Sequence, residues 1–318
     1  MRGALGAWAI VVVVLALAPL LGPVASSSYL LLLANVMLMF MTLALSWDVV
    51  ARTGQLSLAH AGFFGIGAYT VALGYRLAAL PPLLGMLLAA GVAGLVALVL
   101  GVATLRLRGI YFAIATLAFG EVLRTLALEL PDLTGGPVGI SMPPLFGGNR
   151  VQSYYLAGLL LLVALALSLG IRYSPLHYAA SAIRVNERVA AVMGVDVVRV
   201  KVALFVASAV LAALAGAFYM PFITHTDPYD AFSVERSVTP LVFSIFGGLY
   251  TTAGPIVGTL LLRSLEEYLR VTPPWKEGYL VAYGAILVVA VLFLSRGLVG
   301  VVQTRLQPWL VWRPRFSK

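Results

Sequence analysis

The feature that most constrains this chain is a succession of apolar runs, each as long as a helix that crosses a bilayer. A membrane-spanning helix needs about 20 mostly apolar residues. Because 61% of the 318 residues are hydrophobic and only 10% are charged, the chain has far fewer charges than the about 25% of a soluble domain. The sequence therefore predicts an all-α polytopic membrane protein with about ten transmembrane helices. The predicted spans are roughly 5–24, 29–50, 58–79, 82–104, 109–130, 152–171, 199–222, 233–250, 251–269 and 276–296.

Two places leave the number of spans open between eight and ten. The glycines around 247–248 and 254–255 separate two segments that are either full spans or short, re-entrant ones. The first apolar run is either retained as a span or removed as a signal peptide, since Arg2 precedes it and small residues at 25–28 follow it.

The positive charges predict the orientation. With the N-terminus inside, the inner connections of a ten-span chain hold 14 of the 21 Lys and Arg residues and the outer ones hold 5. Such an excess is typical of cytoplasmic loops. We therefore expect both termini in the cytoplasm, and we explain the net charge of +9 by membrane orientation and not by nucleic-acid binding.

The longest inner connection, residues 172–201, has a helical pattern. Ser174 and Pro175 are suited to begin a helix, and Gly194 is suited to end one. An apolar stripe recurs at helical spacing, and polar residues fall on the other side. The stripe comprises Ala179, Ile183, Val189 or Ala190, and Met193. The segment is expected to form one or two short helices that rest on lipid, stay solvated, or insert into a groove of a cytoplasmic protein.

Several kinds of chemistry are absent from the sequence. There is no Cys, no Gly-Lys dipeptide of a phosphate-binding loop, and no H-E-x-x-H or G-x-S-x-G motif. The three histidines are far apart in the chain. We therefore expect no catalytic residue, no metal site and no nucleotide site of the phosphate-loop type on this chain.

Charged residues at membrane depth are costly and need partners. We expect Asp48 with Arg52, and Glu121 with Arg124, to pair along their helices, and Arg263 to reach Glu266 or its neighbour at 267. Acids with basic neighbours do not favour a proton-driven pump.

Glycines are dense in residues 54–70, where Gly62, Gly65 and Gly67 lie inside an apolar run. They predict either close helix packing or a broken helix next to a pathway. Two outer connections, 131–151 and 223–236, are either solvated loops or a docking surface for an extracytoplasmic partner.

Five blocks of sequence, taken together and in order, resemble the branched-chain amino acid ABC importer permeases, in particular the second of their two permease subunits. The blocks are GQLSLAHAGFFGIGAYT (54–70), LRLRGIYFAIATLAFGEVLR (105–124), TGGPVGI (134–140), AIRVNE (182–187) with the pair at 193–194, and the glycines from 247 to 255 with residues 292–298.

The resemblance implies a permease of the bacterial inner membrane that pairs with a homologous permease, two cytoplasmic ATPases and an extracytoplasmic solute-binding protein. ATP and Mg would bind to the ATPases, so this chain itself would not be an enzyme and would need no cofactor. Residues 172–201 would then be the cytoplasmic coupling segment. Its candidate coupling residues are Ile183, Arg184, Asn186, Glu187, Ala190 and Gly194.

The candidate translocation pathway is polar and centres on the glycine-rich block. Its residues are Gln55, Ser57, His60, Tyr69, Tyr111, Thr116 and Glu121. His60 has the alternative role of a hydrogen-bonding group between helices. We expect a single transmembrane permease domain over 1–318, with halves of about 1–150 and 151–318 related as an inverted repeat.

The predicted function is inward transport of branched-chain or related amino acids. Importer permeases for urea or short amides look similar, so they remain an alternative. A secondary transporter driven by an ion gradient is a second alternative, and a non-transporting membrane scaffold is a third.

Overall fold

The computed structural model describes residues 27–104, 107 and 109–272, and isolated positions after that (278, 281, 284, 285 and 297–299). The predicted first span, 5–24, and nearly all of the last, 276–296, lie outside the described residues. Five of the described helices are long and apolar enough to cross a membrane. They are α3 (Ser28–Ala51), α5 (Pro82–Thr104), α6 (Ile110–Glu129), α8 (Arg150–Arg172) and α11 (Val197–Ile223). The all-helical membrane architecture is confirmed, and the count of ten spans stays a prediction.

Three further helices occupy predicted spans. They are α4 (His60–Ala78), α13 (Val234–Gly247) and α14 (Gly254–Val271). At 1.5 Å per residue, the 14 residues of α13 are about 21 Å long, less than the about 30 Å of a hydrocarbon core. Residues 248–253 between α13 and α14 are not helical and are called the second break below. The expected separation of these two segments is therefore present.

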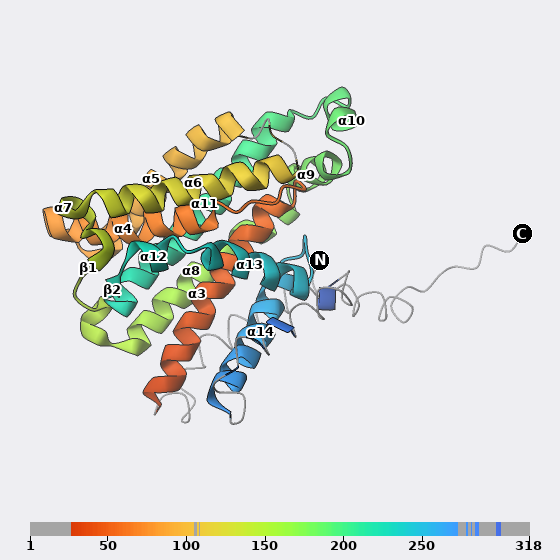
Figure 1. Cartoon of the computed structure of the whole chain (residues 1–318). Helices are drawn as coiled ribbons and strands as arrows, with labels where there is room; N and C mark the ends of the chain where they lie inside the picture. Colours follow the sequence, from red (N-terminus) through yellow and green to blue (C-terminus); the bar gives the residue numbers. More distant parts are fainter. Residues whose placement is uncertain are drawn as a thin grey trace, which may run out of the picture.

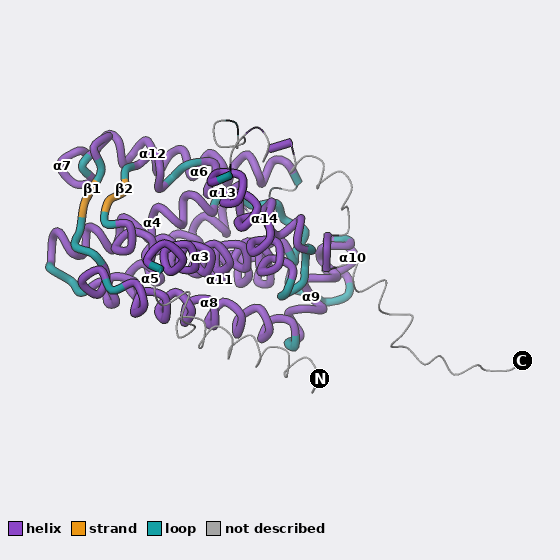
Figure 2. Tube along the Cα trace, turned by 90° about the horizontal axis from the view of Figure 1, so that it is seen from below, coloured by secondary structure: helices purple, strands orange, loops and turns teal. Residues whose placement is uncertain are grey.

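Helices α3 and α11 lie at the centre of the bundle, as Figure 2 shows. Helix α11 packs against α3, α4 and α5, while α8, α13 and α14 pack against α3. Accordingly α3 and α11 are largely buried, whereas α5 and α6 are largely exposed although their residues are apolar. An exposed apolar helix in a membrane protein is covered either by lipid or by another subunit.

Helix α4 runs without interruption through its glycines, so close packing, and not a break in the helix, accounts for them. A Cβ at Gly62 would lie 2.7 Å from the ring of Phe119, and one at Gly65 would lie 2.1 Å from the ring of Phe232. These glycines let aromatic side chains of neighbouring elements lie directly on the α4 backbone.

The two expected outer connections meet in space. Strand β1 (Ile140–Ser141) pairs antiparallel with β2 (His225–Thr226), with Ile140 opposite Thr226. Around them lie α7 (Pro131–Thr134), the short 3₁₀ helices η2 (Gly136–Val138) and η3 (Leu145–Gly148), and α12 (Pro228–Ala231). Helices α9 (Pro175–Val185) and α10 (Glu187–Val192) lie at the opposite end of the molecule (Figure 1). Residues 131–149 and 172–196 are thus at opposite ends of the bundle.

Candidate functional site

The inner segment between α8 and α11 forms two helices joined at Asn186. Pro175 occupies the first turn of α9, and the Asn186 side chain begins α10 by accepting hydrogen bonds from the N–H groups of Arg188 (3.0 Å) and Val189 (3.2 Å). Gly194 follows α10 with a φ of +87°, a conformation that favours glycine. The prediction of one or two short helices is confirmed, with Asn186 as the cap.

The predicted apolar stripe does not continue through both helices, because the chain turns at Asn186. Ile183 of α9 and Ala190 of α10 are buried in the protein, whereas Val189 and Met193 are exposed. A different set of large apolar side chains faces outward around α10. It consists of Val185, Val189, Val192 and Met193, and we call it the α10 apolar surface.

The six candidate coupling residues therefore have different structural roles. Ile183 and Ala190 hold the two helices against the rest of the chain, and Asn186 and Gly194 shape the turns. Glu187 forms an ion pair with Lys201 of α11, whose side chain is only 2% exposed. Arg184 lies with its guanidinium carbon 3.9 Å from the ring centroid of Tyr250, within the range of a cation–π interaction.

His177 lies in the first turn of α9. Partial burial lowers its pKa below the ordinary value, and the cations Arg52, Arg172 and Arg184 lower it further. His177 is therefore a neutral side chain at physiological pH, beside a cluster of guanidinium groups.

The chain between α3 and α4, residues 52–59, is not helical and is called the first break. It starts beside the inner segment, because a Cβ at Gly54 would lie 3.2 Å from Cγ of Arg184. Burial alternates along it. Gln55, Ser57 and Ala59 are buried, while Gly54 and Leu56 are exposed and Leu58 is half-buried. One edge of the first break therefore lies at the surface of the subunit.

Side chains from three helices hydrogen-bond to the backbone of the first break. The indole N–H of Trp47 donates to the carbonyl oxygen of Ser57 (2.9 Å). The N–H of Leu58 donates to Oγ1 of Thr116 on α6 (3.0 Å). These bonds satisfy backbone groups that would otherwise be unpaired at membrane depth, where each unpaired group costs several kcal/mol.

Ser237 of α13 hydrogen-bonds to the backbone at the end of the first break. Its Oγ donates to the carbonyl oxygen of Leu58 (2.6 Å) and accepts from the N–H of Ala61 (2.8 Å). Ser237 lies ten residues before Gly247, hence about 15 Å along α13 from the second break. The first break thus runs from the α9–α10 end of the bundle into its interior, and α4 begins there.

The seven candidate pathway residues do not form one lining. Gln55, Ser57, His60, Tyr69 and Thr116 are buried inside the subunit. His60 bonds through Nε2 to Oγ of Ser208 on α11 (3.1 Å), which is the interhelical role considered from the sequence. Tyr111 and Glu121 instead lie at the surface of α6, with Tyr111 strongly exposed.

The expected ion pairs are present. Arg52 lies 3.0 Å from Asp48, and Arg263 lies 2.6 Å from Glu266. Arg124 lies 2.6 Å from Glu121, with side chains 34% and 36% exposed. The Glu121–Arg124 pair thus lies half-exposed in the middle of an otherwise apolar helix.

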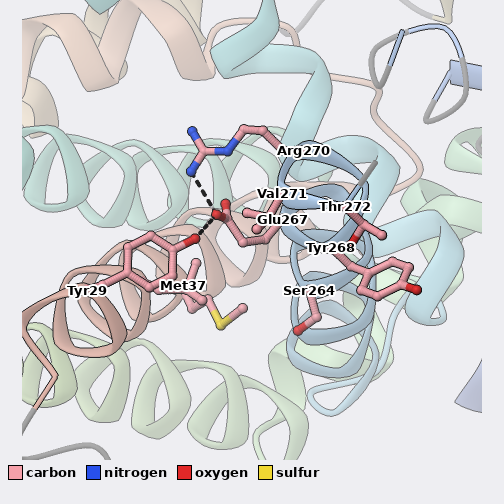
Figure 3. A pocket seen from close by; sticks show the side chains of 9 residues that line it. Tyr29, Met37, Ser264, Glu267, Tyr268, Arg270, Val271 and Thr272 are labelled. Atoms are coloured by element: carbon pink, nitrogen blue, oxygen red, sulfur yellow. Dashed lines mark hydrogen bonds and ion pairs between the residues drawn. The ribbon is translucent and has the colours of Figure 1, made fainter. Parts of the chain in front are cut away.

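A groove of about 720 Å³ lies between α3 and α14, away from the first break. Figure 3 shows Tyr29 and Arg270 both directed at the carboxylate of Glu267, with Met37 and Tyr268 nearby. Tyr29 donates a hydrogen bond to Glu267, and Arg270 forms an ion pair with it at 2.8 Å. None of the candidate pathway residues lines this groove.

Sequence reasoning did not find the residues that hold the breaks. Ser237, Ser208, Ser168 and Tyr250 are single polar or aromatic residues in apolar or loop segments, and their partners are between 84 and 202 positions away in the chain. For the three serines the signal in the sequence was a serine near or inside an apolar run, which is compatible with many partners, and Tyr250 carried no such signal.

An apolar helical bundle with a polar, non-helical segment that enters its interior and an amphipathic helix pair at one end defines a polytopic membrane permease. The family model described as the permease component of branched-chain amino acid transport systems matches residues 29–295. The chain therefore belongs to this family.

Relatives agree with this assignment. The chain is 30% identical to LivM of Salmonella typhimurium, a high-affinity branched-chain amino acid transport system permease protein, over 86% of this chain and 71% of the relative. It is 26% identical to LivH of Escherichia coli, also a high-affinity branched-chain amino acid transport system permease protein, over 53% of this chain and 58% of the relative. It is 28% identical to AraH of E. coli, an L-arabinose transport system permease protein, over 57% and 56%. No solved structure matches the chain.

Proposed function

We propose that this chain is the transmembrane permease subunit of an ATP-driven importer of branched-chain amino acids in a bacterial inner membrane, with both termini in the cytoplasm. The observation that carries the proposal is the α10 apolar surface, at the end of the bundle opposite β1 and β2 (Figure 1). Exposed apolar side chains on a short amphipathic helix fit a groove on a partner protein. The partner we propose is a cytoplasmic ATPase, two copies of which would bind ATP and Mg.

A homologous second permease is the proposed partner within the membrane. Non-helical backbone at membrane depth is tolerated only where protein covers it or where it lines an aqueous cavity. The exposed edge of the first break at Leu56, beyond the end that lies beside α9, meets neither condition in an isolated subunit. The half-exposed pair of Glu121 and Arg124 on α6 also disfavours lipid as a neighbour. Contact with a second permease along α6 and the first break would cover both.

The proposed pathway runs between the two permeases, along this edge. Tyr111 and Glu121 would face it from α6, whereas Thr116 holds the first break from behind through the Leu58 N–H. A surface with a few polar groups among apolar ones suits a zwitterion with an apolar tail. The β1–β2 end, with residues 131–149 and 225–231, is the proposed docking surface for an extracytoplasmic solute-binding protein.

The test is uptake by proteoliposomes that contain this chain, the second permease and the two ATPases, with labelled leucine and the binding protein outside and ATP inside. We expect accumulation that requires ATP, persists with an uncoupler, and is inhibited by unlabelled isoleucine or valine. Collapse with the uncoupler while ATP remains would instead indicate a secondary transporter. Inhibition of uptake by urea or acetamide but not by amino acids would instead indicate an importer of urea or short amides.

A further inference from the structure

One side chain of the inner segment touches both breaks. The guanidinium of Arg184 stacks 3.9 Å from the ring centroid of Tyr250 in the second break. Its Cγ is so close to the first break that a Cβ at Gly54 would lie 3.2 Å away. Gly54 and Tyr250 both have a positive φ, +81° and +64°, which is rare for a tyrosine. Arg184 thus lies between two turns of unusual backbone conformation.

A buried polar network continues inward from Tyr250. The Tyr250 N–H donates to Oδ1 of Asp48 (2.6 Å), and Oδ2 of Asp48 accepts from Nε of Arg52 (3.0 Å). Arg52 also donates to the carbonyl oxygen of Ser168 on α8 (2.9 Å). Oγ of Ser168 lies 3.0 Å from Oγ1 of Thr252, back in the second break. The network therefore connects α3, α8 and the second break, and α8 leads directly into α9.

A buried polar network of this kind contributes little net stability to the folded protein. A buried ion pair must overcome the desolvation of both charges, and well-packed apolar residues at the same positions are often as stabilising. It does, however, fix geometry, because Asp48 and Arg52 accept few arrangements in which all their partners are satisfied. Asp48 and Thr252 are completely buried, so a displacement of Tyr250 reaches Asp48 without a solvent layer between them.

We propose that Arg184 is a positioning residue that transmits movement of α9 and α10 to the two breaks, through Tyr250 on one side and Gly54 on the other. The movement of the first break would reshape the exposed edge at Leu56, which is part of the proposed pathway. This inference rests on the proposed function, since it presupposes that a partner moves α10.

The chain contains no Cys, so one introduced thiol reports on one position. Leu56→Cys places it on the exposed edge of the first break. The experiment measures the alkylation rate of this thiol in the assembled, reconstituted transporter, with and without ATP and vanadate. Leu58→Cys, on the same edge, replaces it as the reporter if Leu56→Cys lowers uptake.

Four substitutions, each added separately to the reporter chain, then distinguish the roles of Arg184 and Tyr250. Arg184→Gln and Tyr250→Leu remove the stacking, Tyr250→Phe keeps the ring, and Arg172→Gln removes an exposed cation at the end of α8 as a charge control. Coupling between distant sites typically corresponds to about 5–150-fold. We therefore expect the nucleotide to change the alkylation rate about fivefold or more in the reporter chain and in the variants with Tyr250→Phe or Arg172→Gln.

In the variants with Arg184→Gln or Tyr250→Leu, we expect the alkylation rate not to respond to nucleotide, although the ATPases still co-purify and hydrolyse ATP. Uptake per ATP hydrolysed should fall in parallel. A nucleotide response that persists in Arg184→Gln, or that is absent from a reporter chain that transports normally, overturns this inference alone. Failure of the unmodified chain to bind an ATPase would instead contradict the proposed function.

Discussion

Gly67 of α4 and Ala213 of α11 are in backbone contact, because a Cβ built at Gly67 would lie 1.9 Å from the carbonyl oxygen of Ala213. The relationship is reciprocal, since a Cβ at Gly216 of α11 would lie 1.9 Å from the carbonyl oxygen of Phe64 on α4. Two glycines, one on each helix, thus allow α4 and α11 to cross with no side chain between them, as small residues do in membrane bundles.

Gly67→Ala should separate α4 from α11 and destabilise the bundle by about 1–3 kcal/mol, the usual cost of adding a methyl group to a packed core. The measurement is the thermal unfolding midpoint of the purified protein in detergent. Gly91→Ala in α5 is the matched control, because no described atom of another helix lies within 4 Å of the position its Cβ would take. The control should be neutral or slightly stabilising, since alanine favours helix over glycine. Equal midpoints for the two variants would contradict the close crossing.

Glu187→Gln should release α10 from α11. It leaves the ammonium of Lys201, 2% exposed, without its charged partner. Removing one member of a buried pair costs several kcal/mol, and we expect about 2–3 kcal/mol here because Glu187 is partly exposed. Trypsin cleavage after Arg188 in the folded protein measures the release and should become faster.

Arg199→Gln is the control for this experiment. It breaks the ion pair with Asp196, whose members are 88% and 50% exposed. Exposed pairs contribute little, so the cleavage rate after Arg188 should stay at the level of the unmodified chain. If Glu187→Gln behaves like Arg199→Gln, the buried pair does not hold α10.

Thr116→Val and Ser237→Ala should each weaken the first break, because both remove a hydrogen-bond partner of the Leu58 backbone. We expect about 1 kcal/mol for each change, the typical net value of one hydrogen bond. The two changes act on the same residue, so the double variant should depart from additivity by about 0.5 kcal/mol or more. Unfolding midpoints of the single and double variants measure this, and strict additivity would show that the two bonds act independently.

The inner segment should lose stability in mild acid. The folded-state pKa of His177 is lowered by burial and by Arg52, Arg172 and Arg184, so between that value and about 6.5 the unfolded chain binds more protons than the folded one. Stability from this group is therefore fully present above pH 6.5 and decreases as the pH falls below it. Trypsin cleavage at Arg188 should be faster at pH 5.5 than at pH 7.5, relative to an unstructured peptide substrate. His177→Gln should reduce this difference.

Introduced thiols test which end of the bundle faces the cytoplasm. Val138 (79% exposed) lies in η2 between α7 and β1, and Val192 (87% exposed) lies in α10. Helix α10 is at the opposite end of the bundle from α7 and β1 (Figure 1). In intact cells, an impermeant maleimide should label Val138→Cys at once and label Val192→Cys only after permeabilisation. The reverse pattern would invert the proposed topology.

Local features of the fold were predictable because their causes are local. The apolar runs gave helix positions within about two residues for α3, α5 and α8, and spacing along a helix gave the pair of Asp48 with Arg52. The turn at Asn186 redirects half of the apolar stripe. It depends on one side chain, which caps α10 and so competes with continuation of the α9 helix. Its amide group was visible in the sequence, but its competing role was not.

Contacts between distant segments were beyond sequence reasoning. The bond of Ser237 to Leu58 joins residues 179 positions apart, and that of Tyr250 to Asp48 joins residues 202 apart. Such pairs depend on how whole helices pack, and periodicity carries no information about that. Thr116 was selected for the pathway as a polar residue in an apolar run, but the structure shows it bonded to the first break.

The alternation of buried and exposed residues in the first break constrains how its length can change. Gln55 and Ser57 point inward and Leu56 outward because neighbouring residues of an extended chain face opposite ways. Inserting a single residue after Gly54 would exchange the two sets and drive a leucine into the space that now holds a serine. Inserting two residues would restore the alternation. This connector should therefore tolerate insertions of two residues but not insertions of one.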